Sequence, residues 1–147
     1  MSSFSKILLV YDGSEEAEVA LRRCSQLSIA LNAQVDVVSV MDADGMNATS
    51  GGLLTDLAYG LLEETARNTL RSAIEKLAVT GVSARGYILF GRTVDAVFRH
   101  ATAFSSDVVV VGHRTPRGFW RWWRGERPVH VDLAERLRGP TIVTVTL

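Results

Sequence analysis

The chain has 147 residues, of which 47% are hydrophobic and 22% are charged. This length fits a single domain, residues 1–147, whose core needs neither disulfides nor a metal. Sixteen Lys and Arg balance sixteen Asp and Glu, so zero net charge gives no general attraction to nucleic acid or acidic membranes. The single Cys24, the lack of a signal-peptide pattern and the lack of any membrane-spanning stretch predict a cytoplasmic protein.

The first predicted strand is Lys6–Tyr11, a short apolar run that ends at a turn. Ser14 closes this turn and is a good helix cap. The helix that follows ends at Asn32 and carries an apolar stripe that includes Cys24. Cys24 is therefore expected to be a small buried hydrophobe and not a reactive thiol.

The middle of the chain begins with a second predicted strand, Val35–Met41. The segment Asp42–Thr55 is rich in Asp, Gly, Ser and Asn, which is typical of a loop. A long helix that ends at Gly81 follows it. The apolar residues expected on one side of this helix are Leu57, Leu61, Ala66, Leu70, Ala73, Ile74 and Leu77. Ser83–Phe90 is the third strand, and its Arg85 and Gly86 suggest the edge of a sheet.

The last third of the chain contains the most apolar run. A helix precedes it, with Val94, Val97, Phe98, Ala101 and Phe104 expected to point inward. Val108–Val111 consists of four consecutive valines and stops at Gly112, which predicts a parallel strand buried on both faces. A short helix around Leu133 then leads to the final strand, Thr141–Leu147.

Nearly every connection between these strands is helical, so right-handed crossovers predict an α/β fold with a five-stranded open parallel sheet and helices on both faces. The two most apolar strands, Lys6–Tyr11 and Val108–Val111, are expected in the middle, which gives the strand order 3-2-1-4-5. Asp12 and the loop that begins at Gly112 then line one crevice. The alternative order 2-1-3-4-5 would move the crevice and separate these segments.

The crevice shows no catalytic motif. The chain lacks a phosphate loop of the G-x-x-x-x-G-K-[ST] type, a G-x-G-x-x-G turn and a G-x-S-x-G elbow. Its three histidines have no catalytic or metal-ligand spacing, and His113 is expected to be a hydrogen-bonding loop residue and not a general base. Residues 113–127 carry five Arg and one Glu, which suits the binding of an anion. We therefore expect a binding protein, not an enzyme, with no metal site evident.

Three patterns resemble the universal stress protein family. They are Val10-Tyr11-Asp12-Gly13-Ser14, the glycines Gly112, Gly118 and Gly125 after the valine strand, and Gly139-Pro140-Thr141-Ile142-Val143. The resemblance covers the whole chain and implies a stress-response module, with ATP or AMP as the possible cofactor. In that family a G-x2-G-x9-G-[ST] loop holds the phosphates. Carried over, Asp12 lies on the nucleoside side, Val40 beside the adenine, and Gly112 and Gly125 are the first and third glycines.

Two positions depart from the family's loop, which here is G-x2-T-x9-G-E. Thr115 replaces the middle glycine, and a β-branched residue resists the close approach that glycine allows. Glu126 replaces the Ser or Thr, and its carboxylate would repel phosphates unless an arginine of the loop turned inward, namely Arg114, Arg117, Arg124 or Arg127. We predict weak or lost ATP binding. The alternative is a functional ATP- or AMP-binding regulatory protein with slow or no hydrolysis.

Two further segments suggest partners. All three tryptophans lie in Phe119–Arg124, where packing onto the domain is favoured over stacking on bases or seating at a membrane. Trp120 and Arg121 are the expected contact for a protein partner, and nucleic acid is not expected. Thr141–Leu147 is predicted to be an edge strand that pairs with a second copy, and the family resemblance also implies a homodimer. Burial of this strand under the preceding helix would instead leave a monomer.

Overall fold

A five-stranded parallel sheet forms the centre of the computed structural model, which describes residues 5–42, 56–114 and 129–147. Its strands are β1 (Lys6–Val10), β2 (Gln34–Met41), β3 (Ala84–Phe90), β4 (Val108–His113) and β5 (Thr141–Thr146). Their order is β3-β2-β1-β4-β5, which confirms the predicted order 3-2-1-4-5. The alternative 2-1-3-4-5 is wrong because β1 pairs with both β2 and β4, with Ile7 opposite Val35 on one side and Val108 on the other.

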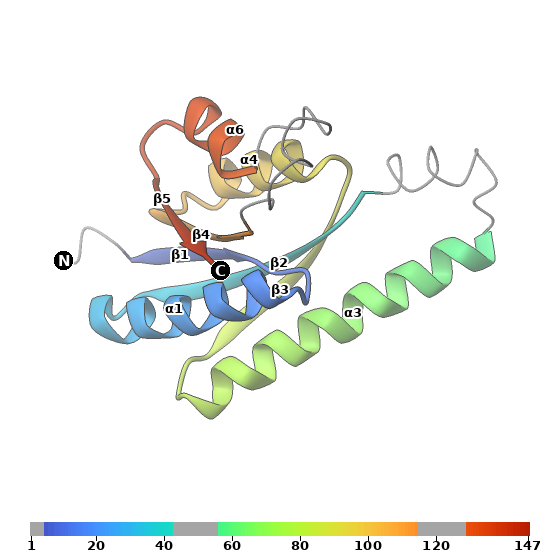
Figure 1. The fold of residues 1–147 in the computed structure, drawn as a ribbon, viewed down its shortest axis with the longest axis horizontal. Helices are drawn as coiled ribbons and strands as arrows, with labels where there is room; N and C mark the ends of the chain where they lie inside the picture. Colours follow the sequence, from blue (N-terminus) through green and yellow to red (C-terminus); the bar gives the residue numbers. More distant parts are fainter. Residues whose placement is uncertain (1–4, 43–55, 115–128) are drawn as a thin grey trace.

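Helices cover both faces of the sheet (Figure 1). They are α1 (Glu15–Leu31), α3 (Asp56–Val79), α4 (Thr93–Ala103) and α6 (Val129–Arg136). Helices α1 and α3 lie on one face, and α4 and α6 lie on the other (Figure 1). The described residues therefore form three layers, as the alternation of strands and helices predicts.

The core is divided by the sheet because successive strand side chains point to opposite faces. Ile7 and Leu9 of β1 are buried in the cluster beneath α1 and α3, whereas Leu8 is buried in the cluster beneath α4 and α6. Cys24 lies on the buried stripe of α1, and burial raises the pKa of its thiol to about 12. The prediction that Cys24 is buried is confirmed.

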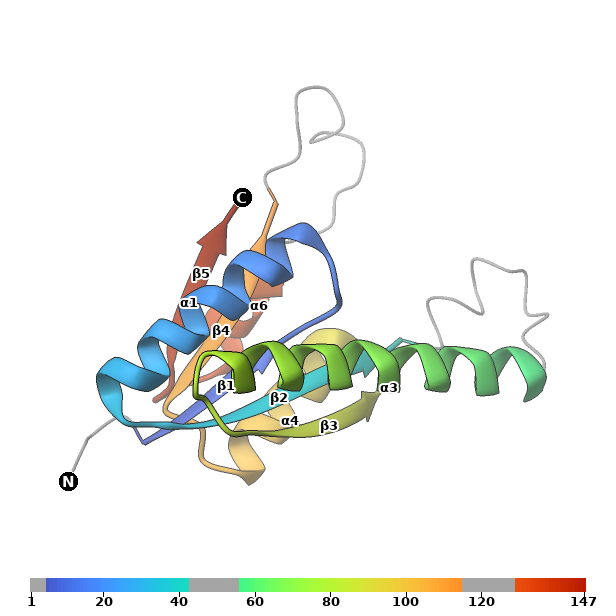
Figure 2. The ribbon, with the colours of Figure 1, turned by 90° about the horizontal axis from the view of Figure 1, so that it is seen from below.

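The first turns of α3 differ from the prediction. Leu57 and Leu61 are 75% and 57% exposed, whereas Leu70 and Leu77 further along the same helix are buried. Figure 2 shows the reason: α3 continues past the end of the sheet, so its first turns have no strand beneath them. Helical spacing predicts a side of the helix, but it does not predict how far the sheet beneath that side extends.

Phe104 also differs from its predicted inward position. It is the residue that follows α4, it is 39% exposed, and its ring stacks on His100 with the centroids 4.3 Å apart. Its backbone N–H donates to the carbonyl oxygen of His100. Phe104 therefore covers the end of α4 and is not part of the buried core.

Candidate functional site

The candidate site lies where β1 and β4 end side by side. Val10 is opposite Val111 in the parallel pairing of these strands. Asp12 follows the end of β1, and Gly112 is the second-last residue of β4, so both lie at the carboxyl end of the central strands. The strand order reverses direction between β1 and β4. Parallel sheets bind ligands at such a point, beyond the carboxyl ends of the strands. The predicted convergence of Asp12 and Gly112 is confirmed as geometry.

Asp12 builds the turn that starts α1. Its Oδ1 accepts hydrogen bonds from the backbone N–H of Ser14 at 2.9 Å and from the Ser14 hydroxyl at 2.5 Å. The Ser14 Oγ in turn accepts from the N–H of Ala17 at 3.2 Å, which caps the helix. The side chain of Asp12 is exposed, and within the described chain its Oδ2 accepts no hydrogen bond. One carboxylate oxygen thus orders the turn while the other faces solvent.

Gly112 is required by packing. A Cβ atom built at this position would lie 3.0 Å from the backbone nitrogen of Ala17 and closer still to the carbonyl oxygen of Glu16. The last residues of β4 therefore press against the first turn of α1. The sequence interpretation gave this glycine a role in phosphate approach, and the structure shows a second requirement that is independent of any ligand.

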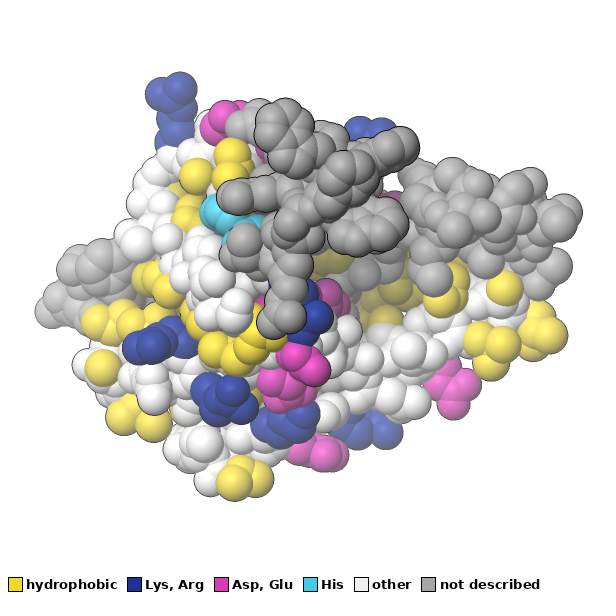
Figure 3. Space-filling model, viewed as in Figure 1, with side chains coloured by type: hydrophobic (Ala, Val, Ile, Leu, Met, Phe, Trp, Pro, Cys, Tyr) yellow, Lys and Arg dark blue, Asp and Glu magenta, His cyan; other side chains and the backbone are white. Residues whose placement is uncertain are grey.

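Arg114 is turned toward α1. Its Nη2 lies 2.6 Å from Oε2 of Glu15, and its Nε lies 3.6 Å from Oε2 of Glu16. Figure 3 shows adjacent basic and acidic side chains on this face of the molecule. Arg114 and Glu15 are 55% and 77% exposed, so water screens the pair and it can exchange for another anion at little cost. Arg114 would have to leave these carboxylates in order to bind phosphate.

Val40 lies at the same end of the sheet, on β2 opposite Leu89 of β3. It is half-buried and packs on the cluster beneath α4 and α6. The neighbouring Ser39 was not predicted to matter, yet its buried hydroxyl donates to the carbonyl oxygen of Tyr11 at 2.9 Å. This bond ties the end of β2 to the segment that leads into Asp12.

The structure places Asp12, Val40, Gly112 and Arg114 at the carboxyl end of the sheet. The other predicted site residues, Thr115, Gly125, Glu126 and Arg127, lie outside the described residues, as do Trp120 and Arg121. The binding roles of all ten residues remain predictions.

A histidine pair stands beside the candidate site. The rings of His113, the last residue of β4, and His130, in the first turn of α6, have centroids 4.7 Å apart in an edge-to-face arrangement. Burial, and then the nearby charge of His113, lower the pKa of His130. The carbonyl oxygen of His113 also accepts from the N–H of Leu147 at 3.0 Å, so Leu147 lies at the carboxyl end of the sheet. No sequence spacing indicated this pair.

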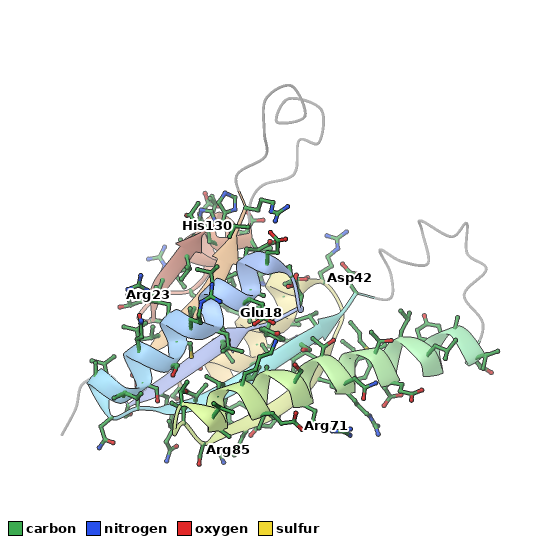
Figure 4. The ribbon with its side chains drawn as sticks, turned by 60° about the horizontal axis from the view of Figure 1, so that its bottom comes forward. Glu18, Arg23, Asp42, Arg71, Arg85 and His130 are labelled. Carbon is green, nitrogen blue, oxygen red and sulfur yellow. The ribbon has the colours of Figure 1, made fainter. Side chains whose placement is uncertain are left out.

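A second polar cluster lies between α1 and α3. Figure 4 shows Glu18 on α1. Glu18 accepts hydrogen bonds from the hydroxyl of Tyr11 and, at 2.5 Å, from Nζ of Lys76. Burial raises the pKa of Tyr11, and its hydrogen bond to Glu18 adds to that shift. Burial opposes the shift at Glu18, but the bonds from Lys76 and Tyr11 hold its pKa below the ordinary value. The bond to Glu18 likewise raises the pKa of Lys76.

Within residues 5–42, 56–114 and 129–147, no three His, Cys, Asp or Glu side chains gather as metal ligands. Over the same residues no helix has the length and apolar character needed to cross a membrane.

These features define a class: α/β proteins with a parallel sheet whose strand order reverses between two central strands, which is where such sheets bind ligands. The universal stress protein family matches residues 3–140 of the chain. The chain therefore belongs to the universal stress protein family. A comparison with curated protein sequences finds no match.

Solved structures share the fold. A universal stress protein family member from Burkholderia pseudomallei has a TM-score of 0.74 and 19% identity, with 99% of this chain and 98% of that chain covered. A universal stress protein in complex with cAMP has a TM-score of 0.72 and 20% identity, with 98% of both chains covered. One from Archaeoglobus fulgidus in complex with dAMP has a TM-score of 0.64 and 17% identity, with 99% of both chains covered.

Proposed function

We propose that this chain is a stress-response module of the cytoplasm that works by binding an adenine nucleotide, with an affinity for ATP that its altered loop weakens. The observation that carries the proposal is the convergence of Asp12, Val40 and Gly112 at the switch point of the sheet. Relatives of the same fold crystallised with cAMP and with dAMP support the ligand class. The proposal concerns binding and includes no turnover.

Asp12 is the residue best placed to contact the nucleoside. Its Oδ1 is used within the turn, and its exposed carboxylate can still accept a hydrogen bond from a ligand hydroxyl. Val40 offers an apolar surface on the neighbouring strand β2, at the same end of the sheet. A sugar with a free hydroxyl and a flat base would match these two groups.

The residues expected near the phosphates favour nucleotides with fewer phosphate groups. Arg114 is already engaged with Glu15 and Glu16, so a phosphate must compete with two carboxylates for it. Thr115 and Glu126 stand at the family's phosphate-holding positions. Each additional phosphate brings more negative charge toward Glu126, so we expect AMP or cAMP to bind more tightly than ATP.

Calorimetric titration with AMP, cAMP and ATP, with and without Mg²⁺, tests this proposal. Asp12→Ala should abolish nucleotide binding, whereas Glu75→Ala, on an exposed position of α3, should leave it unchanged. The double substitution Thr115→Gly with Glu126→Ser restores the family's loop and should tighten ATP binding by about tenfold, equivalent to about 1.4 kcal/mol. If neither the natural chain nor this variant binds any of the three nucleotides at about 1 mM, the proposal is wrong.

A second candidate function, as an interaction protein, is favoured by β5. This strand is at the edge of the sheet, so its outer backbone groups can pair with another strand. We propose a homodimer through Thr141–Leu147, with Trp120 and Arg121 as a separate contact for a protein partner. The double substitution Thr141→Lys with Thr146→Lys, at two exposed β5 positions, should give a folded monomer by light scattering. A natural chain that is monomeric at about 100 μM would contradict the dimer.

For the partner contact, Trp120→Ala and Arg121→Ala should each reduce co-purification of the partner while nucleotide affinity stays the same. Equal partner recovery from both variants and from the natural chain would argue against this surface.

A further inference from the structure

A groove of about 560 Å³ lies at the opposite end of β4 from Gly112. Asp107 and Pro140, which directly precede β4 and β5, both line it. The remaining lining comes from the last turns of α4 and α6 and the segments that follow them. Its volume is in the range of small-molecule sites, roughly 300–1,000 Å³. The groove and the candidate nucleotide site therefore lie at opposite ends of the same strand.

One wall of the groove is apolar and held in place. It consists of Phe98 of α4, Leu137 after α6, and Pro140. The guanidinium of Arg136 lies 4.7 Å from the centre of the Phe98 ring and is also hydrogen-bonded to Asp95. These contacts join α4 to α6 across the groove. A fixed ring beside a proline suits the packing of a flat apolar group.

The other wall supplies hydrogen-bond donors and positive charge. Thr102 and Ser105 contribute exposed hydroxyls. Arg138 is exposed and, in the described chain, forms no ion pair. Ser105 has a φ of +52° because it ends α4: the N–H of the next residue, Ser106, donates to the carbonyl oxygen of Ala101.

Asp107 is the one acidic residue of the lining, and its carboxylate already accepts hydrogen bonds within the protein. Its Oδ2 accepts from the N–H of Ser5 at 2.8 Å, from the Ser5 hydroxyl at 3.2 Å and from the N–H of Lys6 at 2.9 Å. These bonds, first of all the one from the Ser5 backbone, lower the pKa of Asp107. These bonds hold the Asp107 carboxylate against Ser5 and Lys6, so a ligand anion would have to bind at Arg138 on the other part of the lining.

We propose that this groove binds a small ligand with one flat apolar group and one anionic group, of the aryl carboxylate or aryl phosphate class. The apolar group packs on Phe98 and Pro140, and the anion pairs with Arg138. The site is independent of the nucleotide proposal, because it shares no residue with that crevice.

Amide chemical-shift titrations of the full chain with benzoate and with phenyl phosphate test the site. Ligands of this size should bind with a Kd of about 1–10 mM, given roughly 0.3–0.4 kcal/mol per non-hydrogen atom. Saturable shifts are expected at Thr102, Ser105 and Arg138. Benzyl alcohol, which has the ring and no charge, should bind at least about fivefold more weakly.

The matched variants are Arg138→Gln in the groove and Arg23→Gln on the exposed side of α1. Both replace exposed arginines, and an unchanged amide spectrum elsewhere confirms the fold. Arg138→Gln should raise the Kd for benzoate by about fivefold, whereas Arg23→Gln should not change it. The proposal is overturned if no shift saturates by about 100 mM, if benzyl alcohol binds as well as benzoate, or if Arg138→Gln has no effect.

Discussion

Gly112 and Glu16 touch so closely that no side chain fits between them: a Cβ atom at Gly112 would overlap the carbonyl oxygen of Glu16. This contact joins the end of β4 to the first turn of α1. It also changes how the glycine can be tested, because a bulky replacement alters the fold as well as any ligand site. A loss of nucleotide binding in Gly112→Val would therefore be ambiguous.

The first prediction concerns stability at this contact. Gly112→Ala should lower the free energy of unfolding by about 1–3 kcal/mol, because α1 must move away from β4. Gly60 provides the control: it lies in α3, and a Cβ there would meet nothing within 4 Å. Gly60→Ala should raise the free energy of unfolding by about 0.5–1 kcal/mol through helix propensity. Urea denaturation of both variants measures the difference, and equal effects would refute the close contact.

The second prediction concerns the cluster of Tyr11, Glu18 and Lys76. Glu18→Gln should lower the free energy of unfolding by about 1 kcal/mol near neutral pH, a small value because Lys76 is nearly half exposed. Since the folded pKa of Glu18 is lowered, its stabilisation is full above the ordinary value of 4.5 and is lost as the pH falls through the folded pKa.

The raised pKa values of Tyr11 and Lys76 act at the other end of the pH range. Their contribution is full below the ordinary values of 10.0 and 10.5 and is lost as the pH rises through the folded values. Unfolding free energies at about pH 3, 7 and 9 should therefore show the same gap between the natural chain and Glu18→Gln at about pH 7 and 9, and a smaller gap at about pH 3. A gap that does not change with pH would show that the loss comes from packing alone, and Glu75→Gln serves as the exposed control.

The third prediction concerns the histidine pair. Burial and the charge of His113 lower the pKa of His130, so its NMR titration midpoint should lie below 6.5. His113→Gln should raise that midpoint only in part, because burial is the larger cause. Stability from His130 is full above 6.5 and is lost as the pH falls through its folded pKa. A midpoint at or above 6.5 in the natural chain would contradict the observed packing of His130.

The fourth prediction concerns Arg114. Arg114→Ala should change the free energy of unfolding by less than about 0.5 kcal/mol, because its pairs with Glu15 and Glu16 are exposed. If Arg114 binds phosphate in the complex, Glu15→Gln should strengthen AMP binding by about two- to fivefold and Arg114→Ala should weaken it. Calorimetry measures both changes. An AMP affinity unaffected by either variant would exclude Arg114 from the site.

Strand order was predictable because the signal is local and strong. Four consecutive valines require burial on both faces, and only a central strand provides it. The convergence of Asp12 and Gly112 then follows from parallel topology. The exposure of Leu57 was not predictable, because the length of a helix relative to its sheet is a property of the assembled layers.

Contacts between elements that are distant in the chain could not be predicted from the sequence either. Lys76 is 58 positions from Glu18, and only the packing of α3 beside α1 brings them together. His113 and His130 meet for a similar reason, because α6 begins beside the end of β4. Gly112 was selected correctly as a special glycine, but the partner that requires it, the backbone of α1, cannot be identified from spacing.

The bond between Leu147 and His113 bears on how the protein is handled. It places Leu147 at the same end of the sheet as Asp12 and Gly112, whereas Lys6 begins β1 at the opposite end. A bulky label attached at Leu147 would lie beside the candidate nucleotide site and would interfere with nucleotide titrations. A label attached at Lys6 would instead lie at the end of the sheet that holds the groove beside Asp107, because the carbonyl oxygen of Lys6 accepts from the N–H of Asp107.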